Sequence, residues 1–259
     1  MENCIEIQHL QKSFGTVHAV NDLSLQVKQG ELFAFLGING AGKSTTISML
    51  CGQLRQDAGS VRIQGKDTLE DMPQIRQSLG VVFQHSVLDK QLSVLDNLKI
   101  RAALYGITGR AFQKRLIELD ELLELKLLLK RSVGKLSGGQ RRRIDIARAI
   151  FHQPQLLILD EPANFVDNKF EKELYRTLHE LNTRMAIVMV SHDIGTITSV
   201  VKEIVCVNRR VHRHRSNVLT EEQLRNYDCP IQLVSHGHIP HTVLEHHPGD
   251  GCCDHDSVR

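Results

Sequence analysis

The sequence contains no apolar run long enough to cross a bilayer, which takes about 20 residues. Its longest apolar segments, such as residues 186–190, have only the length of a strand. The N-terminus also lacks the basic and then apolar pattern of a secretory signal. We therefore expect the chain to stay in the cytosol, where its six cysteines would be reduced rather than paired.

Neither sign of charge is in large excess, because the chain has 32 lysines and arginines and 30 acidic residues. A net charge of +2 gives no general reason to expect nucleic acid or an anionic membrane surface as a partner. With 259 residues, 41% hydrophobic and 24% charged, most of the chain is neither disordered nor fibrous. One imbalance remains: eight of the 14 histidines lie between His212 and the end, with Cys229, Cys252 and Cys253.

Alternating apolar and polar positions in the first thirty residues predict antiparallel strands. Three solid apolar runs follow later, at residues 32–36, 156–159 and 186–190. Runs of this kind are typical of strands buried on both faces, so they predict a parallel sheet. Acidic or polar residues come directly after the second and third runs, at the sheet edge where α/β proteins place their sites.

The pattern becomes helical between residues 91 and 131. Ser93 begins a capping box that would start one helix. Apolar residues at spacings of three and four predict a second helix, namely Phe112, Leu116, Leu119 and Leu123. We expect a helical subdomain over about residues 86–136, inside a domain of residues 1–210 that precedes a histidine- and cysteine-rich extension, residues 211–259.

Residues 37–44 fit the phosphate-loop pattern G-x-x-x-x-G-K-[ST], between a buried strand and a helix. The backbone of such a loop curls around a triphosphate, the lysine reaches the β and γ phosphates, and the serine hydroxyl completes a Mg²⁺ shell. The predicted nucleotide-binding residues here are Gly37, Asn39, Gly40, Ala41, Gly42, Lys43, Ser44 and Thr45. A glycine-rich turn with a surface lysine is the alternative, which the flanking strand and helix disfavour.

Asp160 and Glu161 end the apolar run at residues 156–159. Asp160 can hold Mg²⁺ through water, and Glu161 can orient or deprotonate an attacking water. A merely solvated pair is the alternative, which the phosphate loop disfavours. Together the motifs predict an α/β fold: a P-loop NTPase core with a mostly parallel sheet, an antiparallel β subdomain and an inserted α-helical subdomain.

A signature segment, Leu-Ser-Gly-Gly-Gln at residues 136–140, narrows the family. With it, residues 5–195 resemble the nucleotide-binding subunit of ABC transporters. The resemblance implies that Phe14 stacks on adenine and that Gln84 touches Mg²⁺ and the attacking water. It also implies that Asp167 crosses a dimer interface and that His192 contacts the γ-phosphate. Taken alone, Phe14 could be core, Gln84 a surface residue and His192 a satisfied strand-end histidine.

The same resemblance implies a homodimer that sandwiches two ATP molecules. Each ATP would lie between Lys43 of one subunit and the signature residues of the other, namely Ser137, Gly138, Gly139 and Gln140. The implied catalytic residues are Glu161, His192, Gln84 and Lys43, with ATP and Mg²⁺ as cofactors. Transmembrane permease subunits would dock on the helical subdomain, which places the chain peripherally on the cytoplasmic face of the membrane.

The subfamily cues diverge along the chain. Residues 37–154 resemble subunits that drive drug or antibiotic export, whereas the part from residue 164 onward resembles zinc or manganese importer subunits. Ile38 and residues 163–166 depart from the family's commoner pattern. A non-transport relative is disfavoured, because only 53 residues separate Gln84 from Ser137 and leave no room for a long coiled coil.

The C-terminal tail carries imidazole and thiolate groups of the kind that bind Zn²⁺. The candidate ligands are His246, His247, Cys252, Cys253 and His255. Their spacing fits no closed structural zinc motif, so a labile site and a solvated tail with incidental histidines both stay open. We favour import of zinc or manganese, with an extracytoplasmic metal-binding protein as a further partner and a multidrug-type exporter as the alternative.

Overall fold

The computed structural model describes residues 3–36, 40–164, 166, 168–191, 203–208, 210–214, 231–236 and 239–244. The chain forms two compact units, Met1–Asn217 and Val218–Arg259. In the second unit, strands β11 (Ile231–His236) and β12 (Ile239–Leu244) pair as an antiparallel hairpin. The domain boundary expected at residue 210 stays a prediction.

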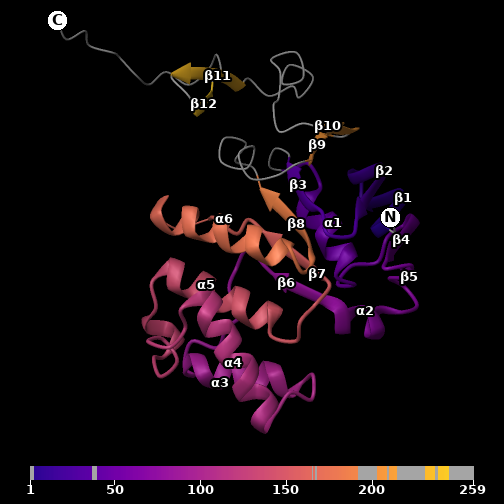
Figure 1. Cartoon of the computed structure of the whole chain (residues 1–259). Coiled ribbons are helices and arrows are strands. Elements are labelled where there is room, and N and C mark those ends of the chain that lie inside the picture. Colours follow the sequence, from indigo (N-terminus) through magenta and orange to yellow (C-terminus); the bar gives the residue numbers. More distant parts are fainter. Residues whose placement is uncertain are drawn as a thin grey trace, which may run out of the picture. The chain divides into compact units, whose positions relative to one another are not determined.

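The first unit contains a six-stranded sheet in the order β10-β9-β3-β8-β7-β6 (Figure 1). Its strands are β3 (Leu32–Leu36), β6 (Leu79–Val82), β7 (Leu156–Asp160), β8 (Ala186–Ser191), β9 (Glu203–Asn208) and β10 (Arg210–His214). All neighbours pair in parallel except β9 and β10. The three apolar runs are the adjacent strands β3, β8 and β7, all fully buried, which confirms the predicted parallel sheet.

A second, antiparallel sheet has the order β2-β1-β4-β5. It comprises β1 (Asn3–Phe14), β2 (Val17–Lys28), β4 (Ala58–Ile63) and β5 (Lys66–Asp67). The predicted pairing of the first thirty residues is confirmed, whereas β4 and β5 were not predicted. Helix α1 (Lys43–Leu50) shares one apolar core with strands of both sheets, so the helix is held between them.

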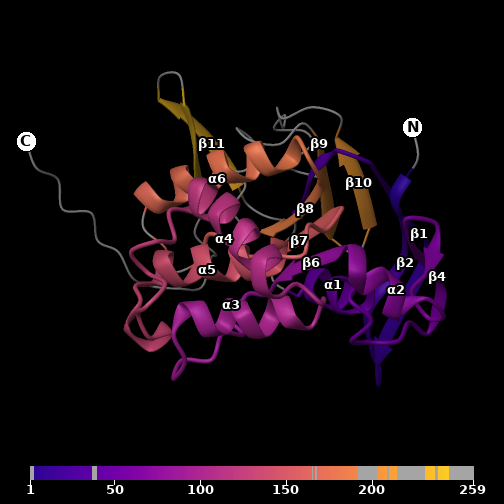
Figure 2. The ribbon, with the colours of Figure 1, turned by 60° about the horizontal axis from the view of Figure 1, so that its bottom comes forward.

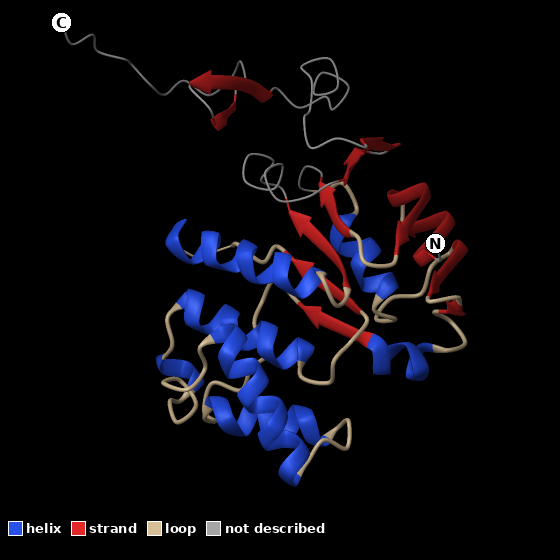
Figure 3. Ribbon diagram, viewed as in Figure 1, coloured by secondary structure: helices blue, strands red, loops and turns tan. Residues whose placement is uncertain are grey.

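The remaining helices are α2 (Met72–Ser78), α3 (Val94–Ala103), α4 (Gly109–Leu123), α5 (Gly138–Ile150) and α6 (Asn168–Asn182), with a 3-10 turn at Val133–Lys135. In Figures 1 and 2, α3 and α4 lie on the far side of the parallel sheet from β1, β2 and β4. Figure 3 shows this block as helices joined by loops. The predicted capping by Ser93 and the buried apolar face of α4 are confirmed. Among the described helices, none has the length and apolarity of a membrane span.

His152 joins the helical block to the parallel sheet. Its ring stacks on Tyr105, with 3.9 Å between ring centroids, and its Nε2 lies 3.2 Å from the carbonyl oxygen of Leu79. Burial of the imidazole, and then the charge of Arg101, lower the pKa of His152 to about 4.

This lowered pKa predicts acid sensitivity. The pKa of His152 in the folded chain lies below its unfolded value of about 6.5. The contribution of the neutral imidazole to the free energy of unfolding is therefore fully present above pH 6.5 and is lost as the pH falls toward 4. Over that window the wild type should lose up to roughly 3 kcal/mol that His152→Gln does not lose. Urea unfolding at several pH values measures the difference, with exposed His179→Gln as control. Equal pH slopes for wild type and His152→Gln would contradict the assignment.

Candidate functional site

A cavity of about 560 Å³ lies where the carboxyl ends of the parallel strands meet the β1–β2 hairpin. The pairings of Leu36 with Ser191 and of Asp160 with Val190 show that β3, β8 and β7 end at the same sheet edge. The described residues that line the cavity come from the hairpin (Phe14, Val17, His18, Ala19), from the loop and start of α1 (Gly40, Gly42, Lys43, Ser44, Thr45) and from the segments after β6 and β7 (Gln84, Glu161, Asn164).

The loop before α1 has a conformation that only glycine adopts without strain. Gly40 and Gly42 have φ of +84° and +86°, and a Cβ on Gly42 would lie 2.1 Å from the carbonyl oxygen of Ala19. Gly42 also caps α1, since its carbonyl accepts a hydrogen bond from the Thr46 N–H at 2.9 Å. The positive end of the α1 dipole therefore lies at the cavity that Gly42 lines, where it favours an anion.

Lys43 brings a cation to this helix start, and only 6% of its surface is exposed. Burial lowers the pKa of the Lys43 ammonium, whereas Glu161 and Asp160 nearby raise it. Asp160 and Glu161 are themselves 7% and 8% exposed. The cavity thus pairs a buried cation with the buried carboxylate of Glu161, and Asp160 lies close enough to act on the same cation. This arrangement can bind a polyanion and supply a base beside it.

Glu161 has an unusual backbone. Its φ is +47°, and its N–H donates to the Val190 carbonyl oxygen at 2.9 Å. A non-glycine residue in this left-handed region is strained by about 1–3 kcal/mol and persists only where its surroundings hold it. The hydrogen bond to the neighbouring parallel strand β8 therefore fixes the backbone of Glu161 at the end of β7.

Asp160 has an oxygen suited to a hard cation. Burial, and then the charge of Glu161, raise the pKa of its carboxyl group. Its Oδ1 is buried and has no hydrogen-bond partner among the described residues. Ser44 and Gln84, whose side chains carry a hydroxyl and an amide oxygen, line the adjoining cavity. An oxygen-only donor set with one orphaned carboxylate oxygen fits Mg²⁺.

The signature segment forms the start of α5. The Ser137 hydroxyl accepts a hydrogen bond from the Gln140 N–H, and the Gln140 side chain accepts one from the Ser137 N–H, both at 3.2 Å. This capping box was not predicted, although Ser-x-x-Gln is its pattern. Gly139 is needed at this point, because a Cβ there would lie 2.9 Å from the Phe170 ring.

The signature segment does not line the 560 Å³ cavity. Of its described residues, Gly138 instead borders a separate cavity of about 140 Å³, together with Gln84 and Asn164. The two cavities share Gln84 and Asn164, so the start of α5 adjoins the larger cavity without lining it.

Comparisons with known proteins agree with this geometry. The family model of the ABC transporter matches residues 20–164, more than half of the chain. The chain belongs to this family. A sulfate/thiosulfate import ATP-binding protein of Bacillus cereus is 38% identical over 210 residues, and the counterpart from Synechococcus elongatus is 38% identical over 206. The matches cover 79% of this chain but 58% and 60% of those proteins, so the chain spans about three fifths of the relatives' length.

Solved structures give the same fold. A chain of an inward-facing transporter described as metal-chelate type has a TM-score of 0.79 and 25% identity, covering 95% of this chain and 98% of that one. A dimeric ATP-binding cassette with ADP and phosphate bound has a TM-score of 0.73 and 25% identity, covering 81% and 98%. The predicted fold, an ABC cassette with parallel sheet, antiparallel subdomain and helical subdomain, is confirmed.

The structure brings together several of the residues expected at the ATP site of an ABC cassette. Phe14 is 51% exposed at the cavity, so the alternative that it belongs to the core is wrong. Ala41, by contrast, packs against the apolar core. The remaining expected residues lie outside the described part of the chain: Gly37, Asn39, Asp167, His192, His246, His247, Cys252, Cys253 and His255.

Sequence reasoning missed two groups of residues at the cassette's site. Val17, His18 and Ala19 line the cavity only because the β1–β2 hairpin folds over α1, and no motif marks them. Arg142 lies in a run of three arginines that looks like a solvated face, yet it is only 5% exposed. No local signal distinguishes it from its neighbours.

Proposed function

We propose that this chain is the ATP-binding and ATP-hydrolysing subunit that powers an ABC importer at the cytoplasmic face of a membrane. The observation that carries the proposal is the cavity in which Lys43, Glu161 and Gln84 converge, beside the buried Asp160. Similarity to import ATP-binding proteins over 79% of the chain supports the direction of transport.

In this proposal the phosphate loop receives the triphosphate through its backbone N–H groups, and Lys43 neutralises the β and γ phosphates. Adenine stacks on Phe14, whose ring also has the Lys12 ammonium 5.7 Å from its centroid. Ser44, Asp160 and Gln84 would hold Mg²⁺, which supplies charge neutralisation at the phosphates when bound. Glu161 then accepts a proton from the attacking water, while His192, outside the described residues, contacts the γ-phosphate.

The proposed active unit is a head-to-tail homodimer. The signature residues Ser137, Gly138, Gly139 and Gln140 do not line the cavity of their own chain, which supports their use on the ATP of the partner subunit. Asp167 would cross that interface. Hydrolysis removes the ATP between the subunits, and the opening is passed to permease subunits docked on the helical subdomain.

Removal of Mg²⁺ tests the proposal. The purified chain should release phosphate from ATP in the presence of Mg²⁺, and a chelator should abolish the reaction, because the buried Asp160 and the triphosphate would face each other without a cation. Phosphate release is the measurement, and restoring Mg²⁺ to the chelated sample is the control. A rate that is unchanged by chelation would contradict the proposed site.

Two classes of cargo are candidates for this importer. Related import proteins are named for sulfate and thiosulfate, which makes an oxyanion the first candidate. A metal ion such as zinc or manganese is the second, favoured by the eight histidines from His212 onward. Uptake of labelled sulfate and of labelled zinc, measured in cells with and without this chain, distinguishes import of the two cargoes. If cells without the chain take up both at the normal rate, the exporter alternative remains.

The tail gives a direct test of the metal candidate. Removing residues 248–259 deletes Cys252, Cys253 and His255 but leaves the cassette intact, so ATPase activity should not change. If the tail binds the cargo metal, calorimetric titration with Zn²⁺ should show one high-affinity site lost in the truncated chain. Equal affinity before and after truncation would remove the idea for this segment.

A further inference from the structure

Arg142 reaches both catalytic segments of its own chain from the helix that carries the signature. Its Nη1 donates to the Phe83 carbonyl oxygen at 2.7 Å. Its Nη2 donates to the carbonyl oxygens of Gln84 at 3.0 Å and Glu161 at 3.2 Å. One guanidinium group thus joins the backbone after β6, the backbone after β7 and helix α5.

The environment of Arg142 makes this contact costly to lose. The side chain is 5% exposed, and Asp145, one turn further along α5, is 6% exposed. Asp145 makes a second link from α5 to the segment after β6, because its Oδ1 accepts a hydrogen bond from the Ser86 hydroxyl at 2.9 Å. Without the guanidinium, three carbonyl groups would lose a charged donor and Asp145 its nearby cation.

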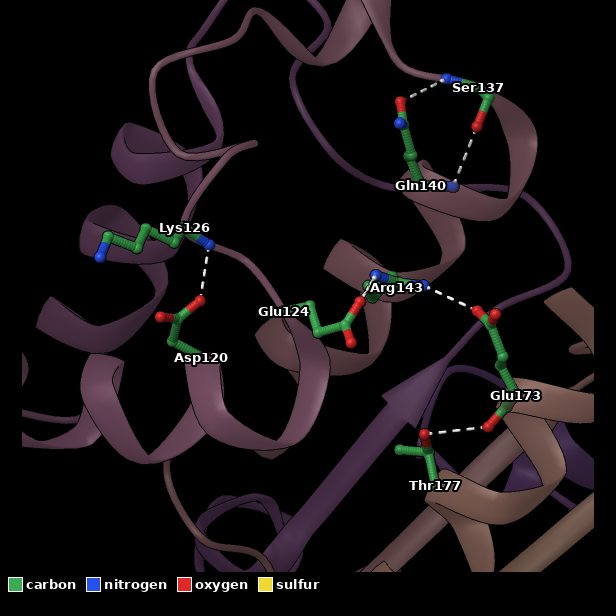
Figure 4. A network of polar contacts seen from close by, with 8 residues as sticks. All are labelled: Asp120, Glu124, Lys126, Ser137, Gln140, Arg143, Glu173 and Thr177. Atoms are coloured by element: carbon green, nitrogen blue, oxygen red, sulfur yellow. Dashed lines mark hydrogen bonds and ion pairs between the residues drawn. The ribbon is translucent and has the colours of Figure 1, made fainter.

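The neighbouring arginine serves a different purpose. Arg143 points to the outer helices, where it pairs with Glu124 of the α4 end at 3.2 Å and with Glu173 of α6 at 3.0 Å (Figure 4). Neither contact involves a residue that lines the 560 Å³ cavity. Arg143 therefore holds the same helix and provides a matched control.

We infer that Arg142 is a positioning residue for hydrolysis, which sets the backbone of Gln84 and Glu161 relative to the signature helix. The inference rests on the proposed ATPase function. In the proposed dimer, Gln84 and Glu161 act on the ATP of their own chain and α5 acts on the ATP of the partner. Arg142 then links the two ATP sites of one subunit.

Arg142→Lys tests the inference, because lysine keeps the charge but its single ammonium cannot span three carbonyls as the planar fork does. We expect kcat for ATP hydrolysis to fall at least about tenfold while KM changes less than about threefold, since the displaced groups act in the transition state. Arg143→Lys should leave kcat within about twofold of wild type. If Arg142 had a merely structural role, both variants would have a lower melting temperature, and kcat would not fall more than KM changes in Arg142→Lys.

The outcomes separate the inference from the function on which it rests. If the wild-type chain does not hydrolyse ATP, the proposed function fails. If the wild type is active and Arg142→Lys keeps the wild-type kcat, or if Arg143→Lys loses as much, the inference about Arg142 is wrong. Arg142→Gln, which keeps a donor for one carbonyl, replaces the lysine variant if that variant does not fold. Failure of both to fold would show that Arg142 is required for folding, and it would overturn the positioning role.

Discussion

Glu161→Gln is expected to bind ATP at least as tightly as the wild type and to lose hydrolysis by at least about 100-fold. The amide preserves the shape of the side chain but cannot accept the proton of the attacking water. Binding should not weaken, because the substitution removes one of the two buried carboxylates that would face a triphosphate. Phosphate release and the binding of a fluorescent ATP analogue measure the two effects.

The same variant should trap the proposed dimer. With ATP and Mg²⁺ present and hydrolysis blocked, size-exclusion chromatography should show a stable dimer that the wild type forms only transiently. Glu180→Gln, which changes an exposed glutamate of α6, is the control and should behave as the wild type. Hydrolysis by Glu161→Gln at the normal rate would show that the role given to Glu161 is wrong.

Gly42→Ala should have the second large effect, on both ATP binding and stability. The new Cβ would lie 2.1 Å from the Ala19 carbonyl oxygen, so the hairpin and the start of α1 must move apart by about 1 Å. Ala19 and Lys43 both line the cavity, and displacement on this scale can reduce activity about 100-fold. ATP affinity, turnover and thermal unfolding measure the consequences.

Gly65→Ala separates the clash from backbone strain. Gly65 has a similar φ of +75°, but a Cβ there would meet no atom within 4 Å. This control should cost only about 1–2 kcal/mol of left-handed strain and should leave ATP binding unchanged. If Gly42→Ala matched Gly65→Ala in stability and in ATP affinity, close packing at Ala19 could not be the reason for the glycine.

Much of the fold could be predicted because its signals are local. The apolar runs of β3, β7 and β8 and the apolar face of α4 are visible in a few consecutive residues, and each lies where predicted. Strands β4 and β5 were missed. Strand β5 has only two residues, and β4 pairs with a strand about fifty positions earlier, so neither is decided by its own sequence.

The candidate site divides in the same way. The phosphate loop, the carboxylates at 160 and 161 and the signature segment could be located from residue pattern alone, because backbone conformation and ligand chemistry restrict residue choice at such positions. Three features depend on long-range packing and became visible in the folded chain: Phe14 faces a cavity, β8 holds the strained Glu161 backbone, and Arg142 rather than Arg143 turns inward. The direction of a side chain depends on neighbours distant in sequence, and three consecutive arginines on one helix point to different neighbours because helical residues are 100° apart.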